Sequence, residues 1–367
     1  STMQLNRLKW ETTTEYNTGL DASFLKGKLR FTVDVYQKYI KDLLQKKVKM
    51  PTSIGYGNGY EVSYMNSGKM TNKGWEFRVD AVPFENRDWR VGFYFNIAHN
   101  ENKITEMPDN YTEENYTFNN GEYAYRREEG RPMGSFYGYR YKGVCQNKDA
   151  TYARDADGNV MKDISGNAIV MRNGTATIAP GDALYEDINH DGVINQYDIV
   201  YLGNSNPRFT GGAGVNVSYK QFKLSAIFYG RYGQDVVNST RLNNESMRGI
   251  DNQSTAVLRR WRNEGDQTDI PRALYGEGYN TLGSDRFVED ASYLRLKSLS
   301  FNYRLPKKII QRWGFSNIDV YVTGYNLFTW TKYTGQDPEV KTENTYARDS
   351  ATTPASIQLV AGFNLSF

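Results

Sequence analysis

Residues 187–198, which read DINHDGVINQYD, carry the side chains whose types and spacing best suit a binding chemistry. If Asp187 is position one, oxygen-bearing side chains also occupy positions three, five, nine and twelve, and a glycine occupies position six. A calcium loop of the EF-hand type takes side-chain oxygens from positions one, three and five, a backbone carbonyl from position seven, and a glycine at six for its sharp turn. We therefore predict a Ca²⁺ site with the ligands Asp187, Asn189, Asp191, Val193 through its carbonyl, Asn195 and Asp198.

The motif departs from the usual loop at its last position, which leaves a second interpretation open. Asp198 stands where a bidentate Glu is usual, and a shorter Asp more often binds through one oxygen. No amphipathic helices flank the segment, so the alternative is a metal-free loop held by hydrogen bonds from side chains to backbone. We expect Ile194 to point inward as an apolar anchor. A bound ion would stabilise a long loop rather than take part in catalysis.

The remaining reactive residue types do not form a catalytic set. The single cysteine, Cys145, excludes an intramolecular disulfide framework and a cysteine-based metal site, and we expect it to be a small filler residue. His99 and His190 lie far apart in the sequence and make no ligand pair. No nucleophile motif or paired carboxylates stand out, so the chain is not expected to be an enzyme.

Composition narrows the class of protein. The formal net charge is +3, with 24% charged residues of both signs, so there is no electrostatic case for binding nucleic acid. Mean hydropathy is −0.70, and the sequence contains no apolar run of about 18 residues, which excludes a transmembrane helix. Aromatic residues reach 14%, with 29 Tyr and 33 Gly, as is typical of β architecture.

An alternation of apolar and polar residues recurs along the chain and predicts about nine strands. It is clearest in the last stretch, IQLVAGFNLSF, where apolar residues occupy every second position up to Phe367. The other alternating stretches are TTEYNTGLDASFL, KLRFTVDVYQK, KGWEFRVDAV, DWRVGFYFNIAHN, GGAGVNVSYKQFKLSAIFYGRYG (two strands), YLRLKSLSFNYRL and NIDVYVTGYNLFTW. In YLRLKSLSFNYRL the apolar phase slips between Leu296 and Leu299, which indicates a bulge.

The polar faces and the connections together favour a membrane barrel over a soluble sandwich. Charged residues such as Asp21, Asp34 and Arg78 fall in the middle of strands, so that face must meet water. Short turns near 26–28, 85–88 and 220–221 alternate with long polar segments at 45–68, 106–206, 239–287 and 332–354. Transmembrane barrels have short periplasmic turns and long extracellular loops. We predict an all-β fold: the C-terminal part of a large antiparallel transmembrane barrel, with 106–206 as a long extracellular loop region.

Strand parity suggests that further strands belong to the same barrel. Complete barrels of this kind have an even number of strands, whereas about nine are predicted. The first residues, STMQLNRLKWETT, lack the basic start and apolar core of a signal peptide. We therefore expect residues 1–367 to be a barrel portion whose plug and upstream strands lie outside this sequence.

Five segments in the same order resemble the C-terminal portion of SusC/RagA-type TonB-dependent outer-membrane transporters. They are RPMGSFYGYRYKGV, GDALYEDINHDGVINQYDIVYLGNSNPRFTGG, DRFVEDASYLRLKSLSFNYRLPKK, VYVTGYNLFTWTKYTGQDPEV and the terminal FNLSF. The resemblance implies a barrel of about 22 strands with an internal plug, set in outer-membrane lipid. It also implies a SusD-like surface lipoprotein as lid, the TonB complex as energy source, and a dimer of transporter–lipoprotein pairs.

The resemblance implies active import of nutrient oligomers, glycans or peptides, across the outer membrane of a Gram-negative-type cell. Phe363, Leu365 and Phe367 then look like the C-terminal signal by which barrels are recognised for insertion. Two alternatives stay open: a passive porin-like barrel, and a secreted soluble β-protein that is stabilised by calcium and binds carbohydrate.

Aromatic residues suggest two further features, neither of which identifies a substrate-binding residue. The loops carry Tyr56, Tyr60, Tyr111, Tyr116, Phe118, Tyr123 and Tyr125. We expect these to pack against loops or a lid rather than to stack on cargo. Trp75 and Trp89 are predicted to flank the turn at 85–88, with Trp330 and Tyr333 at the opposite end of their strand, as in the two interfacial girdles.

Overall fold

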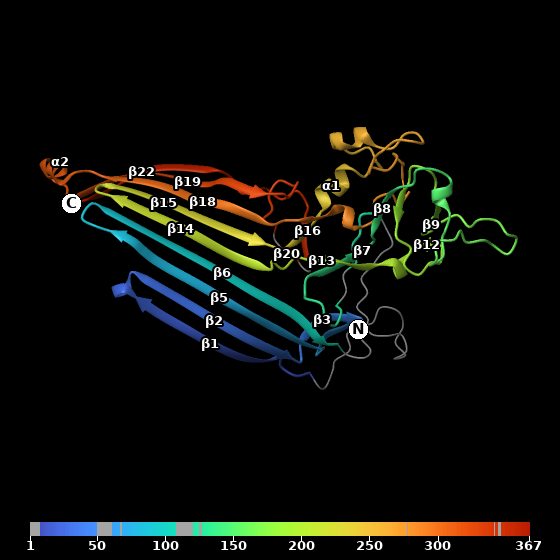
Figure 1. The fold of residues 1–367 in the computed structure, drawn as a ribbon, viewed down its shortest axis with the longest axis horizontal. Helices are drawn as coiled ribbons and strands as arrows, with labels where there is room; N and C mark the ends of the chain where they lie inside the picture. The colour runs from blue at the N-terminus through green and yellow to red at the C-terminus, as the bar shows by residue number, and fades with distance from the viewer. Residues whose placement is uncertain are drawn as a thin grey trace.

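Nine long strands form one antiparallel sheet, as the alternation predicts (Figure 1). The computed structural model describes residues 8–49, 61–66, 68–107, 120–124, 127–276, 278–340, 342–343 and 346–367. In sheet order the strands are β1 (Thr12–Phe24), β2 (Leu29–Lys41), β5 (Lys69–Glu85), β6 (Trp89–Glu106), β14 (Phe209–Tyr219), β15 (Phe222–Tyr232), β18 (Tyr293–Arg304), β19 (Asn317–Thr331) and β22 (Gln358–Ser366). Strands that follow one another in the chain are therefore neighbours in space, and β1 and β22 form the two edges of the sheet.

A bulge interrupts β18 where the sequence pattern slips phase. Against β15 the Cα partners pass from Leu296 directly to Ser298, so Lys297 is the extra residue there. On the other side, two residues of β19, Asn326 and Leu327, lie opposite Lys297. A bulge places one additional residue in a strand and moves the following side chains to the opposite faces. Leu299 consequently returns to the apolar face of the sheet, and the predicted bulge is confirmed.

The short connections gather at one end of the sheet and the long ones at the other (Figure 1). The short end holds η1 (Leu25–Gly27), the turns at 86–88 and 220–221, and the turn that contains α2 (Lys307–Ile310) and η7 (Gln311–Trp313). Lys220 adopts a left-handed conformation at φ 49°. Its N–H donates to the carbonyl of Asp88 at 2.7 Å, which links two neighbouring turns.

The long segments fold into small sheets and helices of their own, which we call the cap. Its strands are β7 (Ser135–Gly138), β8 (Tyr141–Val144), β9 (Arg172–Asn173), β10 (Ala176–Thr177), β11 (Ala183–Tyr185), β12 (Val193–Ile194), β13 (Val200–Asn204), β16 (Asp235–Asn238), β17 (Val288–Asp290), β20 (Thr342–Glu343) and β21 (Tyr346–Asp349). Its helices are η3 (Asp149–Thr151), η4 (Gln196–Asp198), α1 (Ser239–Asn244), η5 (Thr255–Arg259) and η6 (Asp285–Phe287). A separate hairpin, β3 (Leu44–Lys49) with β4 (Glu61–Asn66), extends from β2 and β5. The described parts of the long loops thus contain regular secondary structure.

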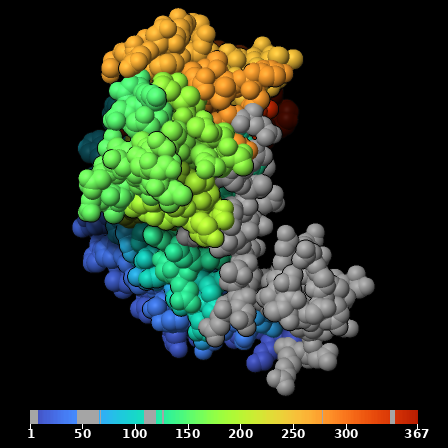
Figure 2. All heavy atoms as spheres, turned by 90° about the vertical axis from the view of Figure 1, so that its right-hand side faces the viewer, coloured from blue at the N-terminus to red at the C-terminus, as the bar shows by residue number. Residues whose placement is uncertain are grey.

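The apolar core lies in the cap rather than in the nine-stranded sheet. The largest cluster of buried residues joins Tyr139, Cys145, Ala153, Met171, Ile178, Ala183, Tyr185, Ile194 and Leu282. Figure 2 looks onto this end and shows the green segment around 150–200 beside the orange segment around 250–280. Cys145 is fully buried within the cluster, as expected of a filler residue.

One face of the nine-stranded sheet is apolar and exposed. Its large side chains include Leu20, Phe24, Val35, Phe93, Val215, Leu224, Phe301, Val322, Leu359 and Phe363, all exposed. A sandwich would bury such a face under a second sheet, at a gain of about 25 cal/mol per Å². Within the described residues no second layer covers it, which fits contact with lipid and argues against the soluble alternative. None of the helices described here is long and apolar enough to cross a membrane.

Candidate functional site

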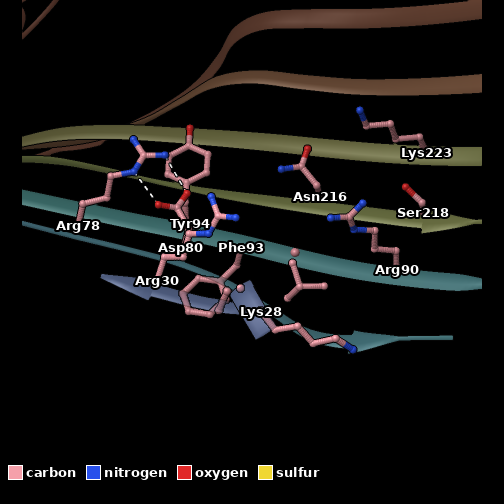
Figure 3. A pocket seen from close by; sticks show the side chains of 14 residues that line it. Lys28, Arg30, Arg78, Asp80, Arg90, Phe93, Tyr94, Asn216, Ser218 and Lys223 are labelled. Carbon is pink, nitrogen blue, oxygen red and sulfur yellow. Dashed lines mark hydrogen bonds and ion pairs between the residues drawn. The ribbon is translucent and has the colours of Figure 1, made fainter. Parts of the chain in front are cut away.

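The opposite face of the sheet is polar and forms a basic wall near the short-turn end (Figure 3). A hollow of about 600 Å³ is lined there by Lys28, Arg30, Arg78, Asp80, Arg90, Tyr94, Asn216, Ser218 and Lys223, among others. The sheet register explains their proximity, because Arg90, Ser218 and Lys223 are successive Cα partners across β6, β14 and β15. Alternation then points all three side chains to the same face.

Cations outnumber carboxylates on this wall. Arg78 holds Asp80 through two hydrogen bonds of 2.7 and 2.8 Å. Glu85 lies 3.5 Å from Arg90 and 3.7 Å from Lys28 at the edge of the hollow. These pairs are exposed and so contribute little to stability. The wall therefore presents several charged donors that can hydrogen-bond an oxygen-rich partner.

The polar face continues across the last strands. Ser300 and Thr323 share a hydrogen bond of 2.8 Å between β18 and β19. Arg304 donates to Asp319 at 2.9 Å in the same pair of strands. Hydroxyl and charged groups thus line this face from β2 to β19, as required of a wall that meets water.

At the long-loop end, Arg295 fastens the segment after β19 to the polar face. Its guanidinium is only 2% exposed and donates to Glu339 at 2.9 Å, to Asp337 at 2.5 Å and to the hydroxyl of Thr329 at 2.9 Å. Lys297, the bulge residue, also reaches Glu339 at 2.9 Å. Sequence reasoning missed this network; its only signal is an arginine at a polar-face position and the acidic residues of QDPEV.

Two features of the loop at 187–198, its glycine turn and its apolar anchor, agree with the motif. Gly192, at position six, is left-handed with φ +81°. The carboxylate of Asp187 accepts hydrogen bonds from the backbone N–H groups of Asp191 and Gly192, at 3.2 and 2.8 Å. Ile194 is fully buried in the cap core, as expected of the apolar anchor. Asn195 caps η4 through its side chain.

Asp198, the last predicted ligand, is fully buried and turned back on the loop. Its oxygens accept from the backbone N–H groups of Ile188 and Asn195, both at 2.8 Å. Burial raises the pKa of Asp198; these hydrogen bonds lower it, and the nearby carboxylates of Asp187 and Asp191 raise it further. In the part of the chain that the structure describes, no three His, Cys, Asp or Glu side chains are grouped so as to hold a metal ion. The predicted ligands thus lie in one loop, where the Asn189 side-chain oxygen accepts from the Asp191 N–H and the Val193 carbonyl accepts from the Asn195 side chain.

Polar contacts join the cap segments that are distant in sequence. Asp182 accepts two hydrogen bonds from Arg272 and one from Asn280. The hydroxyl of Tyr123 donates to the carbonyl of Ser284 at 2.7 Å. These contacts fix the 106–206 region against the 239–287 segment and make the cap one unit at the long-loop end.

The aromatic predictions have mixed outcomes. Tyr123 is buried against Phe136 and Tyr346, which supports packing rather than cargo contact. Tyr56, Tyr60, Tyr111, Tyr116, Phe118 and Tyr125 lie outside the described residues.

The girdle prediction is wrong for the position of Trp75 and for the exposure of Tyr333, which does follow the end of β19. Trp75 does not flank the short turn: it contacts His99 and Phe209 toward the long-loop end, because β5 runs for 17 residues. Tyr333 is buried in the cap, where its hydroxyl donates to Asp349. Trp89 and Trp330 do lie at opposite ends of the sheet, and both are exposed on the apolar face.

The terminal strand β22 pairs with β19 and leaves its apolar residues exposed. Phe363, Leu365 and Phe367 are 68%, 41% and 90% exposed. Phe367 lies 5.0 Å from Phe315 between ring centroids, and its carbonyl accepts from the hydroxyl of Ser316 at 3.2 Å. The predicted insertion signal is therefore accessible at the short-turn end.

Comparison with known proteins identifies similar barrels. Residues 2–327 match the family model described as TonB dependent receptor-like, beta-barrel. The chain is 32% identical over 349 residues to TonB-dependent receptor P3 of Formosa agariphila, covering 92% of this chain and 32% of the relative. It is 27% identical over 370 residues to TonB-dependent receptor SusC of Bacteroides thetaiotaomicron, covering 98% of this chain and 32% of SusC.

A solved structure agrees with these relatives. The structure described as the RagAB peptide transporter matches with a TM-score of 0.73 and 27% identity, over 100% of this chain and 36% of that chain. The chain thus spans about a third of the length of the proteins it matches. These are receptors and transporters, which agrees with the expectation that the chain is not an enzyme.

Proposed function

The chain belongs to the TonB dependent receptor-like β-barrel family, and from this premise we propose that it forms part of an active importer of nutrient oligomers. Proteins of this family lie in the outer membrane. The cargo class that we propose is glycan or peptide oligomers, with energy supplied through the TonB complex. The RagAB structure is described as a peptide transporter, which favours the peptide arm of this proposal.

The observation that carries the proposal is the two-faced sheet. One face exposes large apolar side chains, and the other carries the basic wall and the polar rows between β18 and β19. An outer-membrane barrel alternates lipid-facing and lumen-facing residues in this way. A wide polar lumen suits an oligomer rich in hydrogen-bonding groups.

We propose that a SusD-like surface lipoprotein covers the cap and captures the cargo. SusC and RagAB among the matching proteins support this partner. The cap supplies a structured surface at the long-loop end, held together by contacts such as Asp182–Arg272. A dimer of transporter–lipoprotein pairs completes the proposed assembly.

The test is an uptake assay in cells that carry the full-length protein with an affinity tag. We expect a lipoprotein to co-purify in detergent, and labelled peptides or glycans to enter only while the proton-motive force is intact. Uptake that survives an ionophore and loss of TonB would instead support the passive porin-like alternative. A cap-directed substitution such as Arg272→Ala should weaken lipoprotein capture without removing the barrel from the membrane.

We also propose that residues 187–198 bind Ca²⁺ as a structural ion, with Asp187, Asn189, Asp191, Val193, Asn195 and Asp198 as the candidate ligands. The nearby carboxylates of Asp187 and Asp191 add to the burial that raises the pKa of Asp198. A divalent cation would offset that repulsion. The left-handed Gly192 and the buried Ile194 provide the loop backbone that such a site uses.

A further inference from the structure

The apolar face of the sheet contains a groove near the long-loop end. The groove has a volume of about 660 Å³ and crosses strands β6, β14, β15, β18 and β19. Gly211, Ala213 and Gly230 form its floor. Its walls are the large side chains Phe95, Ile97, Phe209, Phe228, Tyr232, Leu294 and Trp330. A band that carries bulky residues is therefore hollow here.

The sheet register produces the hollow. Gly211 and Gly230 are direct Cα partners between β14 and β15, with Ile97 and Leu294 as their outer neighbours. Built Cβ atoms at Gly211 and Gly230 would lie 2.5 and 2.7 Å from the neighbouring carbonyls of Asn96 and Tyr293. Close backbone contact thus requires glycine at both positions, so the floor carries no side chain.

Aromatic pairs and a lysine complete the groove. Phe209 and Tyr232 stand on one side, with ring centroids 6.5 Å apart, and Phe228 and Trp330 stand on the other at 6.4 Å. At the mouth, exposed Lys332 directly follows β19.

Asp290 also lines the groove, and its carboxylate accepts two hydrogen bonds from Ser292. The Ser292 N–H donates to it at 2.8 Å, and the Ser292 hydroxyl donates to the same oxygen. The ammonium of Lys332 is therefore exposed at the mouth while the Asp290 carboxylate is held by Ser292, and the depth of the groove is apolar.

We propose that this groove binds an acyl chain of an outer-leaflet lipid whose anionic headgroup lies over Lys332. The groove is continuous with the exposed apolar band, and the family places that band in the outer membrane. The long-loop end is the extracellular end of such barrels, and aromatic belts mark the headgroup level. Basic residues at that level attract anionic lipids. The groove lies on the face of the sheet that import does not use, so lipid binding there does not depend on which cargo is imported.

The test uses the full-length protein, purified in detergent, delipidated and titrated with phosphatidylglycerol or phosphatidylcholine under native mass spectrometry. The Ala213→Phe variant fills the floor, and Ala361→Phe is its control at an exposed position of β22 outside the groove. We expect Ala213→Phe to lower phosphatidylglycerol occupancy by more than about tenfold, because several methylene groups lose their site. Ala361→Phe should retain wild-type occupancy.

The headgroup is tested separately. Lys332→Gln should lower phosphatidylglycerol occupancy about fivefold and leave phosphatidylcholine unchanged. If Ala213→Phe does not insert, as judged by heat-modifiable mobility, Ala213→Val replaces it. If the wild type, the Ala213 variant and Ala361→Phe bind lipid equally, the protein makes only bulk lipid contact, and this result would overturn the proposal. So would a groove that binds both lipids equally in wild type.

Discussion

Arg272 and Asp182, 90 residues apart in the chain, form a two-point ion pair in the cap: the Arg272 Nε donates to Asp182 Oδ1 at 2.8 Å, and a terminal nitrogen donates to Oδ2 at 3.2 Å. The Asp182 side chain is 5% exposed and the Arg272 side chain 34%. Asn280 and the N–H of Ala179 also donate to Asp182. One carboxylate therefore joins the 106–206 region to the 239–287 segment.

Replacing Arg272 by Ala should destabilise the cap by about 2 kcal/mol, because Asp182 stays buried and loses its cation. Local opening of the cap should then become roughly 30-fold more frequent. Limited proteolysis of the full-length protein in detergent, with cleavage sites identified by mass spectrometry, measures this directly. We expect faster cleavage within the cap and unchanged cleavage of the barrel.

Arg154→Ala is the matched control for this ion pair. Arg154 contacts Asp149 at 3.0 Å, but the two side chains are 45% and 71% exposed. Exposed pairs contribute about 0–1 kcal/mol, so cleavage should change little. Equal acceleration by both substitutions would show that the cap does not depend on the Asp182–Arg272 contact.

The sheet was predictable because lipid on one side and water on the other require apolar and polar residues to alternate along each strand. Period-two alternation locates all nine strands, and the phase slip at Leu296–Leu299 locates the bulge. Local spacing likewise predicts the turn at Gly192 and the burial of Ile194. Each of these features depends on residues that lie close together in the sequence.

The cap was not predictable, because its contacts join residues that no periodicity relates. The bond from Tyr123 to Ser284 spans 161 positions, and the ion pair of Arg295 with Asp337 spans 42. The misplaced Trp75 has a similar origin, since alternation alone does not show that β5 runs for 17 residues. Side-chain chemistry identified the candidates in these segments but not their partners.

Tyr333→Phe should destabilise the segment after β19 by about 1–3 kcal/mol, because the carboxylate of Asp349 remains buried without this donor. The Tyr333 hydroxyl donates to Asp349 at 2.6 Å. Thermal unfolding and proteolysis within 332–354 provide the readout. Tyr197→Phe, at a 69% exposed position, should change neither measurement. Identical behaviour of the two variants would contradict a role for the hydroxyl.

Cys145 should resist alkylation at pH 8 in the folded protein. Burial raises the pKa of its thiol from 9.0 to about 11. Since the folded-state pKa is raised, the thiol contributes stability that is full below 9.0 and is lost as pH rises toward about 11. Iodoacetamide labelling, followed on the Cys145 peptide, should be slow at pH 8 and accelerate above pH 9 or on unfolding. Labelling of the native protein as fast as that of the denatured protein would rule out this burial.

Removal of Ca²⁺ should loosen the loop at 187–198 if it binds the ion as proposed. Addition of EGTA to the full-length protein should increase proteolysis near this loop, and added Ca²⁺ should restore protection. Asp191→Asn removes one charge from an exposed candidate ligand and should raise the Ca²⁺ concentration needed for protection. Asp163→Asn is the control, because Asp163 lies in another Asx-type turn and accepts from Ser165 and Asn167. If neither EGTA nor Asp191→Asn changes the rate of proteolysis near this loop, the metal-free loop is the correct interpretation.

Deletion of Phe367 should reduce insertion of the barrel more than it reduces the stability of the inserted protein. Its ring is 90% exposed and contacts Phe315, so few packing interactions are lost from the folded sheet. We propose that Phe363, Leu365 and Phe367 act during assembly, when the terminal strand is recognised.

Phe301→Ala, at a 46% exposed apolar position within β18, is the matched control for this deletion. The amount of heat-modifiable protein in the outer membrane measures insertion, and the temperature at which that mobility is lost measures stability. We expect the deletion to lower the amount several-fold with little change in that temperature, and Phe301→Ala to do neither strongly. Equal membrane levels for the deletion and the wild type would remove the signal role from this strand.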